Sequence, residues 1–225
     1  MNTNNKFNTH RLTFSAVMLA LAMVLALVCD LIPFLHMTYG GGFTIASMLP
    51  IIVVSYVYGV KWGLFTSLTY SGIQIIMDLF RGRSSVILAY FLPEDEGGMQ
   101  IFAAIAITLI DYVIAYGILG IGGAFRKNKN KTLALSLGSL LAVGARYVAH
   151  IVSGFIFWGS YAKLFFTEGF YPELGEKILG AFDGKALALV YSVIYNGLYM
   201  IPEIIVTTIA AVIISRLPQI KARQL

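Results

Sequence analysis

Six long apolar runs, separated by polar links, set the pattern of the chain. They cover residues 12–35, 43–58, 62–80, 99–124, 132–158 and 185–214. A helix that crosses a bilayer needs about 20 mainly apolar residues, and each run meets or nearly meets that length. The pattern predicts an all-α integral membrane protein, in which residues 1–225 form a single domain of six transmembrane helices.

Basic residues in the links orient these helices. With six spans, both termini and the links near residues 59–63 and 125–131 share one side, which carries ten basic residues and no acidic one. The other side holds the two longest links, 81–98 and 159–184, and the start of the sixth run at Lys185; it carries five basic residues and seven of the eleven acidic ones. Lysine and arginine favour the cytoplasmic side, so both termini are predicted to be cytoplasmic. The longer outer link is expected to hold a short surface helix.

The composition agrees with a protein embedded in the lipid bilayer. Hydrophobic residues make up 58% of the chain and charged residues 12%, with a mean hydropathy of +0.80, whereas soluble domains carry about a quarter charged residues. The positive-inside rule explains the net charge of +5 better than a nucleic-acid partner does. Cys29 is the single cysteine, which excludes an intrachain disulfide and a cysteine metal cluster. No P-loop, C-x-x-C or H-E-x-x-H motif is present, so neither an enzyme nor a bound cofactor is expected.

A row of unusual residues follows one face of the fifth run. At intervals of four residues, the row consists of Arg146, His150, Gly154 and Trp158. This spacing keeps side chains on one side of a helix. Polar groups are costly at membrane depth and are rarely found there without a use. The glycine is expected to leave room for a bound molecule, so the row is interpreted as one wall of a binding site.

Depth along the last three runs predicts a layered site. Counting from the cytoplasmic ends at 1.5 Å per residue puts charges near mid-membrane, an imidazole and an amide one turn further out, and aromatic rings near the outer surface. From floor to mouth the layers are Asp111 with Arg146 and Glu203, then His150 with Asn196, then Trp158 with Tyr191.

Each of these residues can also be explained by structure alone, without a bound ligand. Arg146 is equally well explained as an ion-pair partner of Asp111 or Glu203. His150 can be satisfied by a neighbouring group, and Trp158 can belong to an interfacial aromatic belt. The stripe of Tyr191, Tyr195 and Tyr199 is typical of helix packing or of an aromatic belt.

Three of the acids near or within the runs also have simple explanations. Asp30 and Asp78 lie close to the outer ends of their helices and are expected to contact water. Glu203 follows Pro202 and is expected to serve the backbone groups that a proline kink releases.

Small residues form a second face, on the first run. Ala16 and Ala20 are four residues apart, and Ala22 and Ala26 repeat the spacing. Such faces let helices approach closely in lipid. The face is explained either by packing within the protein or by docking of another membrane protein.

Several motifs, spread over nearly the whole chain, share one resemblance. The fifth run contains His150, Gly154 and then Phe157-Trp158-Gly159-Ser160-Tyr161-Ala162, and the sixth contains Tyr191-Ser192-Val193-Ile194-Tyr195-Asn196-Gly197. Asp111-Tyr112 lies in the fourth run, and Gly40-Gly41-Gly42 precedes Ser47-Met48-Leu49-Pro50. Together these motifs resemble the thiamine-specific S-components, which are the substrate-capture subunits of energy-coupling factor transporters.

The resemblance implies a six-helix protein of the prokaryotic plasma membrane that binds thiamine tightly near the outer face. It implies three partner subunits, namely a transmembrane scaffold and two ATPases, in keeping with the missing P-loop. Ala16 and Ala20 match the face by which S-components dock on the scaffold. The implied ligand contacts are Asp111, Tyr112, His150, Trp158, Tyr191 and Asn196.

Some positions depart from the family pattern. Tyr39 and Lys163 lie where other members carry tryptophan, and Ile101 lies where some carry tyrosine. One alternative is therefore an S-component for a thiamine precursor or another flat heterocyclic vitamin. A membrane scaffold protein without a small ligand is the less favoured alternative.

Overall fold

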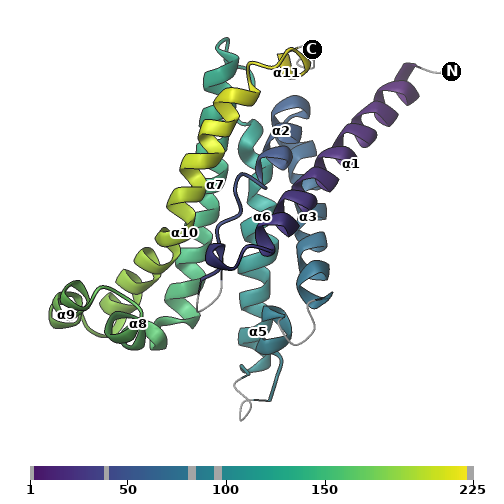
Figure 1. Ribbon diagram of the computed structural model, residues 1–225. Helices are drawn as coiled ribbons and strands as arrows, with labels where there is room; N and C mark the ends of the chain where they lie inside the picture. Colours follow the sequence, from purple (N-terminus) through teal and green to yellow (C-terminus); the bar gives the residue numbers. More distant parts are fainter. Residues whose placement is uncertain (1–2, 38–40, 81–84, 94–97, 222–225) are drawn as a thin grey trace.

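Long helices that run side by side make up the computed structural model, which describes residues 3–37, 41–80, 85–93 and 98–221 (Figure 1). Two of them, α7 (Lys131–Phe157) and α10 (Gly184–Ile214), pack against each other along much of their length. Their residue ranges match the helices predicted over residues 132–158 and 185–214. Predictions that rest on Tyr39, Gly40, Arg81, Arg83 or the acidic residues 94–96 lie outside the described residues.

The N-terminal helices pack together on the other side of the bundle. The first helix, α1 (Thr3–Asp30), runs obliquely past α2 (Leu49–Tyr58) and α3 (Val60–Phe80) (Figure 1). Every α2 residue from Leu49 to Val57 is buried, which explains why its sequence is apolar on all sides. At about 1.5 Å per residue, this helix is too short to cross a bilayer by itself.

The helix predicted over residues 43–58 begins only at Leu49. Pro50 lies in its first turn, where a missing N–H costs nothing. Upstream of that turn, the backbone N–H groups of Thr44 and Ala46 donate to the side chain of Glu203 instead of joining a helix. A carboxylate distant in sequence therefore sets this boundary, and a local pattern cannot reveal it.

The fourth predicted span is helical but irregular. It comprises α5 (Ile101–Thr108), a π-helical turn (Leu109–Ile114), α6 (Ala115–Gly117) and a 3-10 helix (Ile118–Gly123). The last of these packs closely on α2, because Ser55 Oγ donates to the carbonyl of Gly120 and accepts from the N–H of Gly123. Asp111 and Tyr112 lie on the π-helical turn, a feature often found at functional sites.

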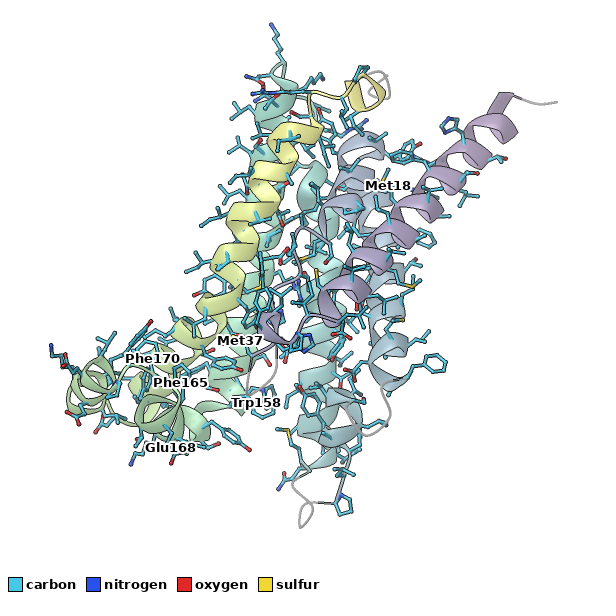
Figure 2. The ribbon with its side chains drawn as sticks, viewed as in Figure 1. Met18, Met37, Trp158, Phe165, Glu168 and Phe170 are labelled. Carbon is cyan, nitrogen blue, oxygen red and sulfur yellow. The ribbon has the colours of Figure 1, made fainter. Side chains whose placement is uncertain are left out.

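Short helices occupy the links. The 81–98 link contains α4 (Val86–Tyr90), and the 159–184 link contains a 3-10 turn (Gly159–Tyr161), α8 (Ala162–Glu168) and α9 (Pro172–Ala181). Another 3-10 turn (Pro33–Leu35) follows α1, and α11 (Pro218–Lys221) follows α10. In Figures 1 and 2, α8 and α9 lie at the end of α10 that is distant from α11; Phe165 belongs to α8, and Phe170 lies between the two short helices.

Four described segments have the length and apolar composition of a membrane span: Thr9–Asp30, Ile101–Gly123, Lys131–Phe157 and Gly184–Ile214. The runs that became α2 and α3 are not among them, so the count of six spans stays a prediction. The start of α1 and α11 lie at the same end of the molecule (Figure 1), as an even number of spans requires. Which end is cytoplasmic also stays a prediction.

Candidate functional site

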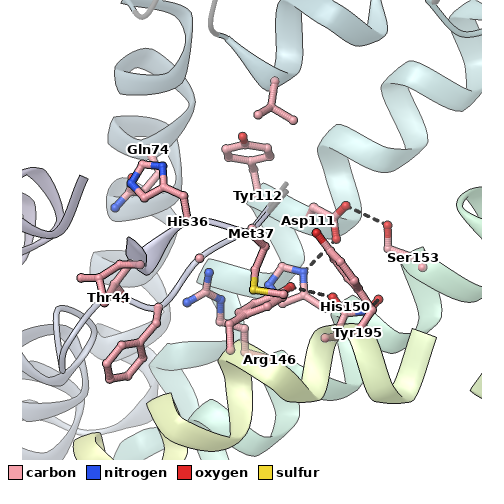
Figure 3. Close-up of a pocket in the computed structure, with 18 of the residues that line it drawn as sticks. His36, Met37, Thr44, Gln74, Asp111, Tyr112, Arg146, His150, Ser153 and Tyr195 are labelled. Carbon is pink, nitrogen blue, oxygen red and sulfur yellow. Dashed lines mark hydrogen bonds and ion pairs between the residues drawn. The ribbon is translucent and has the colours of Figure 1, made fainter. Parts of the chain in front are cut away.

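A cavity of about 360 Å³ opens between α1, α3, α4, the π-helical turn, α7 and α10. Its size falls within the range of about 300–1,000 Å³ that is usual for small-molecule sites. The six residues predicted as ligand contacts all line it: Asp111, Tyr112, His150, Trp158, Tyr191 and Asn196. Figure 3 shows the first three of these, and Figure 2 labels Trp158. The side chains of three distant runs thus face one space.

A carboxylate and an imidazole form the polar centre of the cavity. Asp111 Oδ1 lies 2.9 Å from Nδ1 of His150, and Asp111 Oδ2 accepts a 2.8 Å hydrogen bond from Oγ of Ser153 (Figure 3). His150 and Ser153 are three residues apart on α7, so both reach the same carboxylate. His150 Nε2 is buried and has no hydrogen-bond partner among the described residues. This arrangement offers an anionic group and an unused ring nitrogen to a ligand.

An amide network joins α10 to this centre. Asn196 Nδ2 donates to the carbonyls of Ser192 (2.8 Å) and His150 (3.2 Å), while Asn196 Oδ1 accepts from the hydroxyl of Tyr199 (2.6 Å). The two amide hydrogens are thus used by the protein, and Oδ1 keeps one lone pair for another donor. Asn196 is therefore held in place before any ligand arrives.

Gly154 has a packing role that was not predicted. It lines the cavity, and a Cβ at this position would clash with Ser192 Oγ and lie 3.0 Å from Asn196 Nδ2. The missing side chain therefore allows α10 to approach α7 closely. That it also leaves room for a bound molecule stays a prediction.

Aromatic rings form the walls. Trp158 packs against Tyr90 of α4, with ring centroids 5.8 Å apart, and Tyr191 stacks on Tyr195 at 5.5 Å. Phe165 of α8 lies behind Tyr191 and Tyr195, at 5.4 Å from each ring. Aromatic packing of this kind favours fixed ring orientations, so the walls are braced from outside the cavity.

Arg146 also lines the cavity but makes no ion pair with Asp111 or Glu203 in the described part of the chain. Its guanidinium carbon lies 4.2 Å from the ring centre of Tyr116, and Nη1 contacts Met48 Sδ at 2.7 Å. The suggestion that it neutralises one of the acids is therefore wrong. A cation over an aromatic face gains roughly 0.5–2 kcal/mol.

Asp78 was expected to contact water, and the structure shows that it is buried, with only 2% of its surface exposed. It accepts hydrogen bonds from Ser85 Oγ (2.6 Å) and from the N–H of Ile87 (2.9 Å). Because Ser85 caps α4, Asp78 holds that short helix, and with it Tyr90, against the cavity. Asp30 is half-buried, and its Oδ1 lies 3.5 Å from His36 Nε2 at the edge of the cavity.

Several lining residues were missed by the sequence reasoning. Tyr195 and Tyr199 belong to a stripe that was interpreted as packing, although its four-residue spacing from Tyr191 was a signal that all three share a face. Ser153 had a similar signal in its spacing from His150. The sequence held no signal for Tyr90, because α4 lies in a link between predicted helices.

Comparisons with known proteins agree on one family. The family model described as "Thiamine transporter protein (Thia_YuaJ)" matches residues 12–104 and 96–167. The chain is 30% identical over 209 residues to thiamine transporter ThiT of Bacillus subtilis (strain 168). The aligned region covers 88% of this chain and 86% of that protein.

A solved structure supports the same fold. ThiT from Listeria monocytogenes superposes with a TM-score of 0.56 at 20% identity, covering 91% of this chain and 97% of that one. The family consists of membrane transporters rather than enzymes, in line with the apolar helices of this chain. The chain is a multi-pass membrane protein that belongs to the thiamine transporter protein family.

Proposed function

We propose that the chain binds thiamine in the cavity and serves as the substrate-capture subunit of an energy-coupling factor transporter. One observation carries this proposal, namely that Asp111 and Trp158 line the same cavity. Thiamine combines a permanently cationic thiazolium with a flat aminopyrimidine. A cation gains roughly 0.5–2 kcal/mol from an aromatic face, with tryptophan the best, and a carboxylate beside it adds charge attraction.

The charge of Asp111 is available to a cation in this arrangement. Its two oxygens meet the neutral hydroxyl of Ser153 and a nitrogen of His150. Arg146, the strongest competitor for that charge, instead lies on Tyr116. The site therefore keeps a carboxylate for the thiazolium while satisfying part of its hydrogen-bonding capacity.

The remaining contacts suit the neutral parts of thiamine. Tyr112 and Tyr191 bring hydroxyl groups that can donate and accept, and Asn196 Oδ1 has a free lone pair for an amine hydrogen. His150 Nε2 is the natural partner for a further hydrogen of the ligand. We assign these four residues, with Asp111 and Trp158, as the thiamine contacts.

Transport would require partners. The sequence has no P-loop for ATP, so we propose that a scaffold subunit and two ATPases supply the energy and that no cofactor is needed. Ala16 and Ala20 are both exposed on α1, beside Val17 and Leu21, as a docking face requires. The proposed arrangement has six spans with both termini cytoplasmic.

The alternative ligands share the chemistry of the site. A thiamine precursor or another flat heterocyclic vitamin would use the same aromatic walls, and competition with the separate pyrimidine and thiazole moieties distinguishes these ligands from thiamine. A scaffold protein without a small ligand is disfavoured, because it has no use for a cavity lined by Asp111, His150 and Asn196.

Tryptophan fluorescence of the purified protein, titrated with thiamine, tests the proposal. Trp158 lines the cavity, whereas Trp62, the only other tryptophan, donates to Ser15 and lies 4.5 Å from the Arg11 guanidinium. We expect saturable quenching at submicromolar thiamine that disappears in Trp158→Phe and persists in Trp62→Phe. No change up to millimolar thiamine would exclude this ligand.

A further inference from the structure

A buried carboxylate on α10 holds the chain segment that follows the first link. Glu203 is 1% exposed, and its Oε2 accepts from the N–H of Thr44 (2.7 Å) and from the Thr44 hydroxyl (3.2 Å). Its Oε1 accepts from the N–H of Ala46 (3.2 Å) and from the Thr207 hydroxyl (3.0 Å). Three of these four donors belong to the segment, and one belongs to the same helix as Glu203.

The burial of this charge calls for an explanation. An ionised side chain inside a membrane span is costly unless polar groups surround it, and Arg146 does not serve as its partner in the described part of the chain. The N–H groups of Thr44 and Ala46 would also lack partners in apolar surroundings, because α2 begins only at Leu49. Glu203 and the segment therefore satisfy each other.

The segment held by Glu203 is a wall of the cavity. Residues 41–47, called the wall segment below, contribute five lining residues: Gly41, Gly42, Phe43, Thr44 and Ser47. In Figure 3, Thr44 lies on the opposite side of the cavity from Asp111 and Ser153. The wall segment also lies close to Tyr199, because a Cβ added to Gly41 would lie 3.0 Å from the ring of that tyrosine. Displacement of Thr44 would thus move the wall that faces the polar centre.

We propose that Glu203 is a positioning residue that fixes the wall segment, keeps the cavity closed on that side and slows the escape of the bound ligand. Glu203 itself is not among the described residues that line the cavity, so it acts through Thr44 and Ala46. The part of this proposal that concerns ligand escape rests on thiamine binding. The part that concerns closure of the cavity does not.

Cys29 reports on closure without any ligand. It is the only cysteine of the chain, lines the same cavity as the wall segment and is 5% exposed. We would measure its alkylation by N-ethylmaleimide in ligand-free protein for the wild type, Glu203→Gln, Thr44→Val and the control Thr207→Val. The control removes one hydrogen bond from the same carboxylate but none from the wall segment.

We expect Glu203→Gln to raise the alkylation rate by about tenfold, because a neutral amide replaces a charged acceptor of three segment donors. Thr44→Val loses a single hydroxyl contact and should raise the alkylation rate about threefold. Thr207→Val should be alkylated at the wild-type rate. If Glu203→Gln does not fold, the alkylation rates of Thr44→Val and Thr207→Val test the proposal instead. Equal rates in that pair, or a wild-type rate in a folded Glu203→Gln, overturn the proposal.

Thiamine kinetics then test the ligand part. Glu203→Gln should release thiamine about tenfold faster with little change in the association rate, whereas loss of a merely structural group would lower the fraction of competent protein instead. If wild-type protein does not bind thiamine, the alkylation result stands and the proposed ligand fails. If thiamine leaves all variants at the wild-type rate, retention by the wall segment is excluded.

Discussion

Asp111 Oδ1 lies 2.9 Å from Nδ1 of His150, and these two residues come from different helices that meet at the cavity. A neutral imidazole that donates through Nδ1 keeps Nε2 as an acceptor. Nε2 is buried and has no partner in the part of the chain described by the structure. The pair thus presents an anionic oxygen and a neutral acceptor to one ligand.

Removing the charge of Asp111 should weaken thiamine binding. Asp111→Asn keeps the shape of the side chain but loses the attraction to the thiazolium. Interactions with charged groups contribute roughly 1.5–3 kcal/mol, so the affinity should fall by one to two orders of magnitude in isothermal titration calorimetry. An unchanged affinity would show that Asp111 does not face the cation.

Two controls separate charge from shape in that experiment. Ser153→Ala removes one hydrogen bond from the carboxylate while the charge remains, so its effect should be clearly smaller. The free aminopyrimidine moiety carries no thiazolium, and its affinity should hardly differ between wild type and Asp111→Asn. Equal losses for both ligands would point to a collapsed cavity instead.

Helical periodicity was the strongest guide to the site. Residues four apart must share a face, so the spacing of His150 and Trp158 predicted one wall, and the cavity is lined by both. Depth counting put Asp111 at the level of Arg146 and Glu203 and put His150 one turn further out, whereas in the structure Asp111 contacts His150. The count did predict that the last three runs share one site, and residues of all three line the cavity, although a ligand role for each residue stays a prediction.

The features that the sequence did not predict depend on partners distant in the chain. Asp78 looked like a helix-end acid in contact with water, but it accepts from Ser85 and Ile87 at the start of α4, which lies in a link without a clear pattern. Glu203 was assigned to a proline kink and instead holds Thr44. Hydrophobic periodicity carries no information on which loop a buried carboxylate will meet.

Gly154→Ala should loosen the pairing of α7 and α10. The new Cβ would clash with Ser192 Oγ and approach Asn196, and overpacking of this kind costs roughly 1–3 kcal/mol. The midpoint of thermal unfolding should fall by several degrees, and thiamine binding should weaken because Asn196 shifts. Differential scanning fluorimetry and a binding titration measure the two effects.

Gly144→Ala is a matched control on the same helix, because the Cβ it would add has no heavy atom within 4 Å beyond its chain neighbours and the adjacent backbone of its own helix. Alanine exceeds glycine in helix propensity, so this variant should be as stable as the wild type or slightly more stable. The double variant Gly154→Ala/Ser192→Ala should recover part of the lost stability. A harmless Gly154→Ala would refute close packing at this position.

Asp78→Asn should release α4 from the bundle. The amide has a single acceptor oxygen in place of the two that now accept from Ser85 and from the backbone N–H groups of Val86 and Ile87. Amide hydrogens of residues 86–90 should exchange faster, as measured by mass spectrometry. Thiamine affinity should fall several-fold because Tyr90 packs on Trp158.

Thr69→Val serves as the control for Asp78→Asn. Thr69 is exposed on the same helix, and its hydroxyl bonds to the carbonyl of Phe65 one turn away. Its replacement should leave both the exchange rates of residues 86–90 and the thiamine affinity unchanged. If Asp78→Asn behaves like this control, α4 is held by other contacts.

A bulky residue on the outer face of α1 should separate capture from transport. Ala16 and Ala20 are exposed and are not among the described residues that line the cavity, so Ala16→Leu or Ala20→Leu should leave thiamine binding unchanged. If a scaffold subunit docks there, the added side chain would prevent the close approach that small residues permit, and thiamine uptake by cells should fall by at least about tenfold.

Val148→Leu, which enlarges an exposed apolar residue of α7, should not impair uptake. Normal uptake with Ala16→Leu and Ala20→Leu combined would place the docking face elsewhere, whereas weaker binding would connect α1 to the cavity.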